Sequence, residues 1–352
     1  MYKYVIGLMS GTSLDGLDIV YVRFETENLQ NFQILASESL PYQRKWQNRL
    51  KEAFRLSADE LADLDVELGK FFANLVRRFI EKNQINQIDL IASHGQTIFH
   101  RPEKGYTIQI GSGAHINVLT KIKTIADFRS QDVALGGQGA PLVPLGDRLL
   151  FSQYDYCLNI GGFANISFEK NNERKAFDIC PANIVLNHYV KKMGFDYDNK
   201  GNIAREGKIN ITLLDELNAL TFYNDNHPKS LGWEFVTEKI LPLIDKFNLK
   251  IPDILRTYVE HIAIQITNKI NCGTVLVSGG GAYHTLLIEQ IENYSKAQII
   301  VPEKELIDFK EALIFALLGL LRDEDKINIL SSVTGSKFDH SSGVIFDAFA
   351  HF

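Results

Sequence analysis

Apolar positions along this chain follow two spacings, one typical of strands and one typical of helices. Apolar runs at residues 4–8 and 19–22 enclose a short polar segment, which predicts strand, turn and strand. A longer apolar series over residues 61–79 recurs at helical spacing, and Ser57 and Glu60 in front of it have the spacing of a capping box. Strands and helices continue to alternate, so we expect an α/β architecture.

Shorter apolar runs extend this prediction along the rest of the chain. We expect strands near residues 88–92, 106–110, 124–128, 157–160, 166–168, 175–179 and 274–277, and helices over 252–270 and 305–321. The run at 88–92 is expected to end at the polar stretch from Ser93 to Thr97, and the run at 175–179 is expected to carry Asp178 at its end. Pro181 is expected to open a helix, because proline suits the first helical position.

The pattern of residues 5–20 returns at residues 157–168, where apolar runs again enter and leave a glycine-rich turn. This echo indicates an internal duplication. Between the two copies, the glycine- and proline-rich stretch from Gly136 to Pro144 has the character of a hinge or of a boundary between lobes. We therefore expect an N-terminal lobe at residues 1–135 and a C-terminal lobe at residues 136–352.

Composition narrows the class of protein. With 352 residues, the chain is too long for one typical core and suits two. The net charge of -6 comes without a basic stripe, so neither nucleic acid nor a membrane surface is an expected partner. No apolar run reaches the ~20 residues of a membrane span, and no signal peptide is expected. The three cysteines form no CxxC, so we expect no disulfide framework and a cytoplasmic location.

The opening turn, from Gly7 to Asp18, carries glycines, hydroxyls and carboxylates. Glycines let main-chain N–H groups approach an anion, and hydroxyls add further donors. Asp15 and Asp18 would repel a phosphate unless a divalent cation lay between them. A phosphate together with a metal ion therefore explains both halves of the turn, and an ordinary glycine-rich hairpin is the alternative.

Two further glycine-rich turns follow predicted strands, at residues 159–162 and 279–281. Ligands of α/β proteins bind at strand ends, and a triple glycine before a helix allows close approach to the helix N-terminus. None of the three turns has the P-loop pattern or a convincing Rossmann pattern. Together they suggest a nucleotide held between two lobes, and a tight strand–helix turn is the alternative at residues 279–281.

Two carboxylates are candidates for chemistry. Asp178 is the candidate base, because a carboxylate at a strand end can accept a proton or activate water. Its alternative role is to cap the helix expected at Pro181. Glu311 stands on an otherwise apolar stretch and so needs a partner or a cleft, with placement in the first turn of its helix as the alternative.

Basic and imidazole side chains supply further candidates. His94 and His100 could contact a substrate, serve a structural role or ligate zinc, and the absence of a nearby carboxylate ligand disfavours zinc. Arg129 could bind a carboxylate or phosphate through two hydrogen bonds. An ion pair between Arg129 and Asp127 is the alternative.

These motifs together resemble the anhydro-N-acetylmuramic acid kinases, a branch of the actin/Hsp70/sugar-kinase superfamily. The matching pieces span nearly the whole chain. They are Gly7–Asp18, Ser93–Thr97 with His100 and Pro102, Asp127–Arg129, Gly136–Pro144, Asn159–Gly162 with Asn165, Phe177–Asp178 with Pro181 and Asn183, Pro228–Ser230 with Gly232 and Glu234, Gly279–Gly281, Glu311–Ala312 and Thr334–Gly335. The first motif and the glycine–proline stretch are the most specific.

The resemblance implies a two-lobed, RNase H-like fold with a nucleotide cleft between the lobes, and the use of ATP and Mg²⁺. The residues expected to bind the nucleotide are Gly11, Thr12, Ser13, Leu14, Asp15, Gly16, Leu17, Asp18, Asn159, Gly161, Gly162, Gly279, Gly280 and Gly281. Asp15 or Asp18 would lie near the metal ion, and Asp178 would be the catalytic base. The residues expected to line the sugar pocket are Ser93, His94, Arg129 and Glu311.

The resemblance also implies a reaction. In such enzymes the base activates a water molecule, which attacks the anomeric carbon of a 1,6-anhydro sugar, and the freed O6 takes the γ-phosphoryl group of ATP. The product is N-acetylmuramic acid 6-phosphate, in peptidoglycan recycling. The family is dimeric, so we expect a homodimer, with lobes that close over the substrate.

The chain departs from the family pattern near the expected base and in two loops. The departures are Ile179, Cys180, Ala182, His227, Trp233, Ser278 and His284. Trp233 in place of an arginine removes a fixed charge, which bears on phosphate or carboxylate contacts. Two alternatives therefore stay open: a kinase of the same fold that acts on another sugar, and a non-catalytic protein that binds ATP or a sugar.

Overall fold

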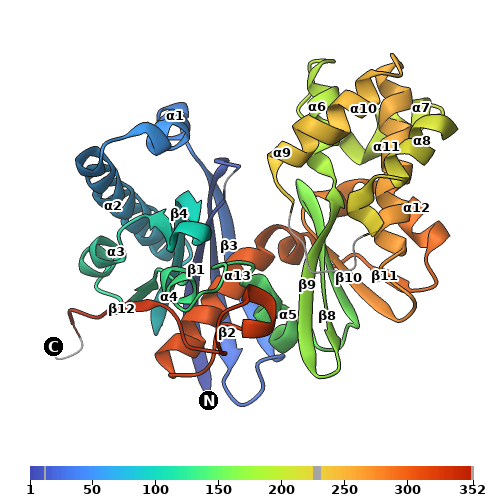
Figure 1. Cartoon of the computed structure of the whole chain (residues 1–352). Helices are drawn as coiled ribbons and strands as arrows, with labels where there is room; N and C mark the ends of the chain where they lie inside the picture. Colours follow the sequence, from blue (N-terminus) through green and yellow to red (C-terminus); the bar gives the residue numbers. More distant parts are fainter. Residues whose placement is uncertain (12, 225–230, 350–352) are drawn as a thin grey trace. The chain divides into compact units, whose positions relative to one another are not determined.

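Two compact units, each built on a sheet, make up the chain (Figure 1). The computed structural model describes residues 1–11, 13–224 and 231–349. The first unit comprises Met1–Ser152 together with Phe309–Phe352, and the second comprises Gln153–Asp308.

The first unit contains a mixed sheet with the strand order β12-β6-β4-β1-β2-β3, and β5 pairs with β4. Its strands are β1 (Tyr2–Ser10), β2 (Gly16–Glu25), β3 (Phe32–Pro41), β4 (Leu90–Arg101), β5 (Tyr106–Ile110), β6 (Thr124–Ala126) and β12 (Val344–Phe346). β1, β2 and β3 are antiparallel neighbours, whereas β4 runs parallel to β1 and β6 parallel to β4. Its helices are α1 (Arg44–Glu52), α2 (Ala58–Lys82), α3 (Gly113–Thr120), α4 (Ser130–Ala134), α5 (Val143–Leu150), α14 (Ser331–Thr334) and most of α13 (Lys304–Asp323).

Helices α2 and α13 cover opposite faces of this first sheet. The apolar stripe of α2 forms one core cluster with side chains of β1 and β2. On the other face, a methyl group at Gly7 would lie 2.1 Å from the carbonyl oxygen of Ala312, and one at Gly319 would lie 2.5 Å from Cβ of Ala92. Glycine at these two positions therefore lets α13 lie directly on β1 and β4.

The second unit contains a sheet with the strand order β11-β10-β7-β8-β9. Its strands are β7 (Tyr156–Ile160), β8 (Phe163–Lys170), β9 (Glu173–Pro181), β10 (Thr274–Ser278) and β11 (Gln298–Ile300). Its helices are α6 (Asn183–Lys191), α7 (Asn202–Glu206), α8 (Ile211–Asn218), α9 (Trp233–Phe235), α10 (Leu241–Asp245), α11 (Ile251–Thr267) and α12 (Thr285–Tyr294). A π-helical turn over Val236–Ile240 joins α9 to α10. Apolar side chains of β7, β10 and α11 meet in one core cluster.

Both units repeat one topology. The order β3-β2-β1-β4-β6 of the first sheet matches the order β9-β8-β7-β10-β11 of the second. In each, the first two strand pairs are antiparallel and the last two are parallel. A long helix, α2 in one unit and α11 in the other, precedes the fourth of these strands. The expected α/β architecture and the expected duplication are therefore confirmed at the level of topology.

The structure divides the chain differently from the boundary expected between residues 135 and 136. The first unit continues to Ser152, and the chain returns to it at Phe309. Packing explains the difference, because α5 and α13 lie in direct contact: a methyl group at Gly146 would lie 2.5 Å from Cγ1 of Ile314. Glycines and prolines mark a turn in the chain, but they do not reveal which sheet the next helix covers.

Local expectations near the candidate site are also corrected. β4 continues through the polar stretch that was expected to end it, since Gly95, with a φ of +73°, lets the strand bulge and pair further with β5. β9 extends to Pro181, so Asp178 lies inside the strand and not at its end. Helix α6 begins at Asn183 and not at Pro181.

Two expected helices are present. α2 begins with the expected capping box, in which Ser57 and Glu60 satisfy each other's main-chain N–H groups. The apolar segment of α13 from Ala312 to Leu321 is buried throughout. Within the described parts of the chain, no helix combines the length and the apolar character needed to cross a membrane.

Candidate active site

The turn between β1 and β2 is an exposed loop that starts at an open glycine. Ser13 and Asp15 are exposed, and Thr12 lies outside the described residues. The N–H of Leu14, which has a φ of +60°, donates to the carbonyl of Gly11 at 3.2 Å. Among the described atoms, a methyl group on Gly11 would meet none nearer than Ser13 Oγ at 3.5 Å. The bare side of this glycine is therefore accessible to a ligand.

Gly16 and Leu17, expected to contact the nucleotide, are instead the first residues of β2. Leu17 is fully buried in the core, and a methyl group at Gly16 would lie 2.4 Å from a carbonyl oxygen of β3. Packing therefore accounts for both positions. The next carboxylate, Asp18, accepts a hydrogen bond from Ser39 Oγ. The exposed loop thus ends at Asp15.

A chain of buried hydrogen bonds joins this loop to the sheet. Ser10 Oγ donates to Gln96 Oε1 at 2.6 Å and lies 2.6 Å from the hydroxyl of Tyr42. The N–H of Tyr42 donates to the carbonyl of Asp15 at 3.0 Å. Burial raises the pKa of Tyr42 above its ordinary value, so its hydroxyl stays protonated and can donate to Ser10.

His94 and Arg129 are the centre of the polar cluster in the first unit. Arg129 donates to Nε2 of His94 from Nε at 3.0 Å and from Nη2 at 2.9 Å. Nδ1 of His94 lies 2.8 Å from the carbonyl of Gly95, so Nδ1 carries the proton. Burial, and then the charge of Arg129, lower the pKa of His94 to about 3. The imidazole is therefore neutral at physiological pH.

Both ring nitrogens of His94 are thus hydrogen-bonded within the protein, which argues against His94 as a zinc ligand. Nδ1 of His100 lies 3.2 Å from Thr107 Oγ1. Among the described residues, no group of three or more His, Cys, Asp or Glu side chains is arranged so that it could hold a metal ion. The geometry of the described residues therefore gives zinc no support, and His94 acts as a hydrogen-bond acceptor for Arg129.

Arg129 has one further fixed contact, from Nη1 to the carbonyl of Gly139 at 2.6 Å. Since a guanidinium carries five N–H groups, one N–H on each terminal nitrogen has no hydrogen-bond partner among the described residues. Burial lowers the pKa of Arg129 to about 10, against the effect of nearby carboxylates, so the side chain stays charged. The alternative ion pair between Arg129 and Asp127, both among the described residues, is not formed, and Asp127 Oδ1 instead accepts the N–H of Ser130.

Glu311 belongs to the same cluster. Loss of hydration raises the pKa of Glu311, the charge of Arg129 lowers it, and the charge of Asp18 raises it again. The side chain is nevertheless exposed, so water and solutes can reach it. Helix α13 begins at Lys304, and the acidic residue of its first turn is Glu305. The alternative that Glu311 is a first-turn residue is therefore wrong.

Ser93 differs from the other residues expected in the sugar pocket. Its side chain is fully buried, and its Oγ has no hydrogen-bond partner among the described residues. Ser93 pairs with Leu8, whose side chain lies in the core beside α2, and paired residues point to the same face. The ring of His94 lies 4.6 Å from that of Phe315, in α13 on the other face. The structure therefore does not bring the Ser93 side chain together with Arg129.

The second unit brings the two other glycine-rich turns into contact. β7 and β10 are parallel neighbours, and Asn159 pairs with Ser278, so the turns that follow them lie at one edge of the sheet. A methyl group at Gly279 would lie 2.5 Å from Asn159 Oδ1, and one at Gly281 would lie 2.2 Å from a side-chain atom of Ile160. A 3₁₀ turn precedes α12, so the triple glycine does not lead directly into that helix.

Three other glycines of these turns have an open side. Methyl groups at Gly161, Gly162 and Gly280 would meet no described atom nearer than 3.5, 3.7 and 3.8 Å respectively. The atom nearest to Gly280 is Nδ2 of Asn183, which donates to a carbonyl of β7 at 3.2 Å. Packing therefore explains glycine at Gly279 and Gly281, whereas the three open glycines leave room for a ligand beside the main chain.

Asp178, in β9, lies opposite Asn165 of β8. Its Oδ2 accepts the N–H of Leu231 at 2.7 Å, and its Oδ1 has no hydrogen-bond partner among the described residues. Burial raises the pKa of Asp178, and the N–H of Leu231 acts in the opposite direction. Ala182 is the N-cap residue of α6, and no side chain caps that helix. The alternative that Asp178 is a helix cap is therefore excluded.

Three groups at these sites were not among the residues expected from the sequence. They are the N–H of Leu231, the side chain of Asn183 and the carbonyl of Gly139. Main-chain groups leave no trace in a side-chain pattern, so only Asn183 offered a signal, as the polar residue of its family motif. The structure assigns it to the edge where the two turns of the second unit meet.

The departures from the family pattern are mostly in packed positions. Buried among them are Ile179, Cys180 and Ala182. His284 is also buried, and its Nδ1 accepts the N–H of Leu287 in the first turn of α12 at 3.2 Å. Trp233, the first residue of α9, is exposed. His227 and the Pro228–Ser230 motif lie outside the described residues.

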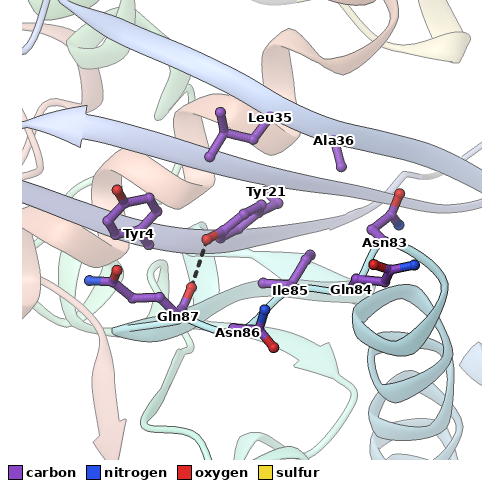
Figure 2. Close-up of a pocket in the computed structure, with 9 residues that line it drawn as sticks. All are labelled: Tyr4, Tyr21, Leu35, Ala36, Asn83, Gln84, Ile85, Asn86 and Gln87. Carbon is purple, nitrogen blue, oxygen red and sulfur yellow. Dashed lines mark hydrogen bonds between the residues drawn. The ribbon is translucent and has the colours of Figure 1, made fainter.

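A hollow of about 340 Å³ in the first unit lies away from all of these residues (Figure 2). It is lined by Tyr4, Tyr21, Leu35, Ala36 and Asn83–Gln87. Figure 2 shows the hydroxyl of Tyr21 directed at the carbonyl of Gln87, to which it donates at 2.7 Å. No residue expected in the nucleotide or sugar site lines this hollow, so it is not the candidate site.

Comparison with known proteins gives the arrangement a family. The family model described as anhydro-N-acetylmuramic acid kinase matches residues 3–348. An anhydro-N-acetylmuramic acid kinase from Mannheimia succiniciproducens is 35% identical, over 98% of this chain and 99% of the relative. One from Haemophilus influenzae is 34% identical, over 98% of each. With a match of this extent, the chain is a phosphotransferase and belongs to the anhydro-N-acetylmuramic acid kinase family.

Proposed function

We propose that this chain opens the ring of 1,6-anhydro-N-acetylmuramic acid with water and phosphorylates O6 with ATP, giving N-acetylmuramic acid 6-phosphate. The family match over residues 3–348 and the names of the relatives support this substrate. The structural observation that carries the proposal is Asp178. Its carboxylate is held by one main-chain N–H, keeps the other oxygen unpartnered among the described residues, and has a raised pKa.

Asp178 acts as the general base. Its unpartnered oxygen accepts a proton from water while the water oxygen bonds to the anomeric carbon. The bond between that carbon and O6 breaks, and O6 attacks the γ-phosphorus of ATP as ADP leaves. The N–H of Leu231 donates to Asp178 Oδ2 and so fixes the orientation of the carboxylate. Oδ1 is then left to accept the proton of the water. A raised pKa makes this carboxylate a stronger base than an exposed aspartate.

The glycine-rich turns suit a nucleotide. Methyl groups at Gly11, Gly161, Gly162 and Gly280 would meet no described atom within 3.4 Å, so phosphates can approach the main-chain N–H groups there. We assign Gly11–Asp15 and these turns of the second unit to ATP, with Gly279 and Gly281 as the glycines that let the turns pack.

The carboxylates beside the first turn suit Mg²⁺. Asp15 is exposed and Asp18 is in reach of solvent, and two carboxylate oxygens with phosphate oxygens are the donor set that Mg²⁺ prefers. Asp15 and Asp18 would hold the ion. When bound, Mg²⁺ neutralises phosphate charge and so favours phosphoryl transfer.

We assign the sugar to the polar cluster of the first unit. Anhydro-N-acetylmuramic acid carries a carboxylate, and Arg129 has an N–H on each terminal nitrogen with no partner among the described residues. A guanidinium matches a carboxylate through two parallel hydrogen bonds. His94 fixes the other edge of the guanidinium, and the exposed carboxylate of Glu311 can accept hydrogen bonds from sugar hydroxyls.

The test is turnover in water enriched in ¹⁸O, with ATP and a panel of anhydro and ordinary sugars. We expect a product that carries one phosphoryl group on O6 and one ¹⁸O on C1, together with one ADP for each sugar. Phosphorylation of ordinary sugars alone, with none of the anhydro sugar, would favour the kinase of another sugar. Binding of ATP and sugar without turnover would favour the non-catalytic alternative.

Two finer points follow from the resemblance to the family. We propose that the chain is a homodimer, which light scattering on the purified protein will test through its mass. We also propose that the reaction belongs to peptidoglycan recycling in the cytoplasm. Accumulation of the anhydro sugar in cells that lack the protein is the expected result, and an unchanged pool would contradict it.

A further inference from the structure

The stretch of chain that holds Arg129 is itself held by a buried carboxylate. Asp132, in α4, has no exposed surface. Its Oδ2 accepts the N–H of Gly139 at 2.7 Å, and its Oδ1 accepts the hydroxyl of Thr334 at 2.7 Å. The carbonyl of Thr334 accepts the N–H of Gln138 at 2.8 Å. One carboxylate therefore fixes the glycine-rich stretch from two directions.

Two positions of this stretch accept only glycine. A methyl group at Gly137 would lie 2.3 Å from Asp132 Oδ2. Gly139 has a φ of +68°, and a methyl group there would lie 2.8 Å from Cγ2 of Val133. Glycine is therefore required at two positions of the expected hinge, at Gly137 by the contact with Asp132 and at Gly139 by its backbone conformation and the contact with Val133.

Gly139 connects the carboxylate to the guanidinium. Its N–H donates to Asp132, and its carbonyl accepts Nη1 of Arg129 at 2.6 Å. His94 holds the opposite edge of Arg129 through Nε and Nη2. Rotation of the guanidinium is therefore blocked from both edges, and the position of the Gly139 carbonyl decides where the remaining N–H groups point.

We propose that Asp132 is a positioning residue, which orients the guanidinium of Arg129 toward the carboxylate of the sugar through the main chain of Gly139. This inference rests on the proposed function, in which Arg129 binds that carboxylate. Removal of the Asp132 oxygens leaves the N–H of Gly139 buried and unpartnered. The main chain at Gly139 then shifts, and the carbonyl in the following peptide group no longer supports Arg129.

The principal variant is Asp132→Leu, which keeps the branching of the side chain and removes both acceptors. We expect its KM for the anhydro sugar to rise by about tenfold or more, because a hydrogen bond to a charged group contributes roughly 1.5–3 kcal/mol. Its KM for ATP should stay within about twofold of the wild type. Asp132→Asn keeps one acceptor for Gly139 and should restore most of the affinity.

Asp65→Leu is a matched control. Asp65 Oδ1 accepts the N–H of Gly111 at 2.7 Å, which is the same kind of contact in the same unit, but Asp65 is not hydrogen-bonded to Arg129 or its partners. We expect Asp65→Leu to lower the melting temperature while the sugar KM stays unchanged. If Asp132→Leu does not fold, Thr334→Val and Thr334→Ser make the same test, with the affinity lost in the first and kept in the second.

A double-mutant cycle separates positioning from a general loss of stability. In the Arg129→Lys background, Asp132→Leu should raise the sugar KM by less than about twofold further, because the guanidinium that Asp132 would orient is already absent. Independent, multiplying effects of the two changes would overturn the inference. An unchanged sugar KM in Arg129→Lys alone would instead overturn the assignment of Arg129 in the proposed function.

Discussion

Arg129 donates two hydrogen bonds to a single atom, Nε2 of His94, at 3.0 Å from Nε and at 2.9 Å from Nη2. That nitrogen can accept them only while it carries a lone pair, so His94 must be neutral with its proton on Nδ1. Protonation would place an imidazolium against a guanidinium. The pKa of His94 agrees with a neutral imidazole, because burial and the charge of Arg129 lower it to about 3.

Acid should therefore weaken the fold through His94. A histidine in the unfolded chain has a pKa of about 6.5. Between that value and about 3 the unfolded chain binds more protons than the folded one, so the free energy of unfolding falls as the pH drops through this range. His261, buried with its pKa also lowered to about 3, acts in the same direction.

Urea unfolding at about pH 7 and about pH 5 will measure this effect. His94→Gln keeps an acceptor for Arg129 without a titrating group, so we expect it to lose less stability between the two pH values than the wild type loses. His261→Gln is the comparison variant. We expect it to change the pH dependence of the free energy of unfolding by a similar amount and to leave sugar binding unchanged. If His94→Gln loses as much stability between the two pH values as the wild type, the inference that the imidazole of His94 is neutral is contradicted.

Asp178→Asn should lower kcat by about 10²- to 10⁴-fold, because an amide cannot accept the proton of the attacking water. The variant keeps an oxygen for the N–H of Leu231, so the fold and the affinity for ATP should be preserved. Because the pKa of Asp178 is raised, the acid limb of the wild-type kcat/KM profile should lie above the ordinary aspartate range. Turnover close to that of the wild type would exclude Asp178 as the base.

Two neighbouring glycines distinguish contact with the nucleotide from packing. Gly280→Ala adds a methyl group that would meet no described atom nearer than 3.8 Å, so stability should hold. Its KM for ATP should rise on the order of tenfold, or about 1.4 kcal/mol, because the methyl group occupies the side open to phosphate. Gly281→Ala forces a carbon to 2.2 Å from Ile160 and should destabilise the fold by about 1–3 kcal/mol.

Thermal unfolding and ATP titration of the two glycine variants make the comparison. Equal losses of stability with no difference in KM for ATP would show that the edge formed by Gly279–Gly281 does not receive the nucleotide. The pair is informative because both changes add the same methyl group at adjacent positions.

Asp15→Asn should raise the Mg²⁺ concentration needed for half-maximal turnover, since the exposed carboxylate loses its charge. Asp18→Asn should do the same and also weaken the contact with Ser39. Asp59→Asn, in the first turn of α2, is the control with an unchanged Mg²⁺ dependence. A titration with Mg²⁺ at saturating ATP measures all three variants. Identical midpoints for Asp15→Asn and the wild type would remove Asp15 from the metal site.

Local chemistry explains why parts of the site could be predicted. The turn from Gly11 to Asp15 is recognised by glycines, hydroxyls and a carboxylate that are close in sequence, and Ser13 and Asp15 of this turn are exposed in the structure. The capping box at Ser57 and Glu60 is a contact over three residues, so its spacing suffices to predict it. Asp178 was singled out as a carboxylate expected at a strand end, and the structure places it inside β9.

The side-chain environments that the sequence did not predict depend on contacts between distant segments. Ser93 and His94 are adjacent in the sequence, yet the pleat of β4 turns one toward α2 and the other toward α13. An ion pair with the neighbouring Asp127 was the alternative role for Arg129, but the guanidinium donates to His94 and Gly139. No spacing rule connects such residues, because their separation is set by the packing of strands and helices.

By itself, the sequence determined the alternation of strands and helices, the duplicated strand–turn–strand pattern, the three glycine-rich turns and the family. These depend on periodicity and on steric rules that act within a few residues. Only the tertiary structure decided that α13 returns to the first sheet, that packing requires Gly281 whereas Gly280 has an open side, and that Asp132 holds the support of Arg129. These features depend on close packing and main-chain hydrogen bonds between segments far apart in the chain.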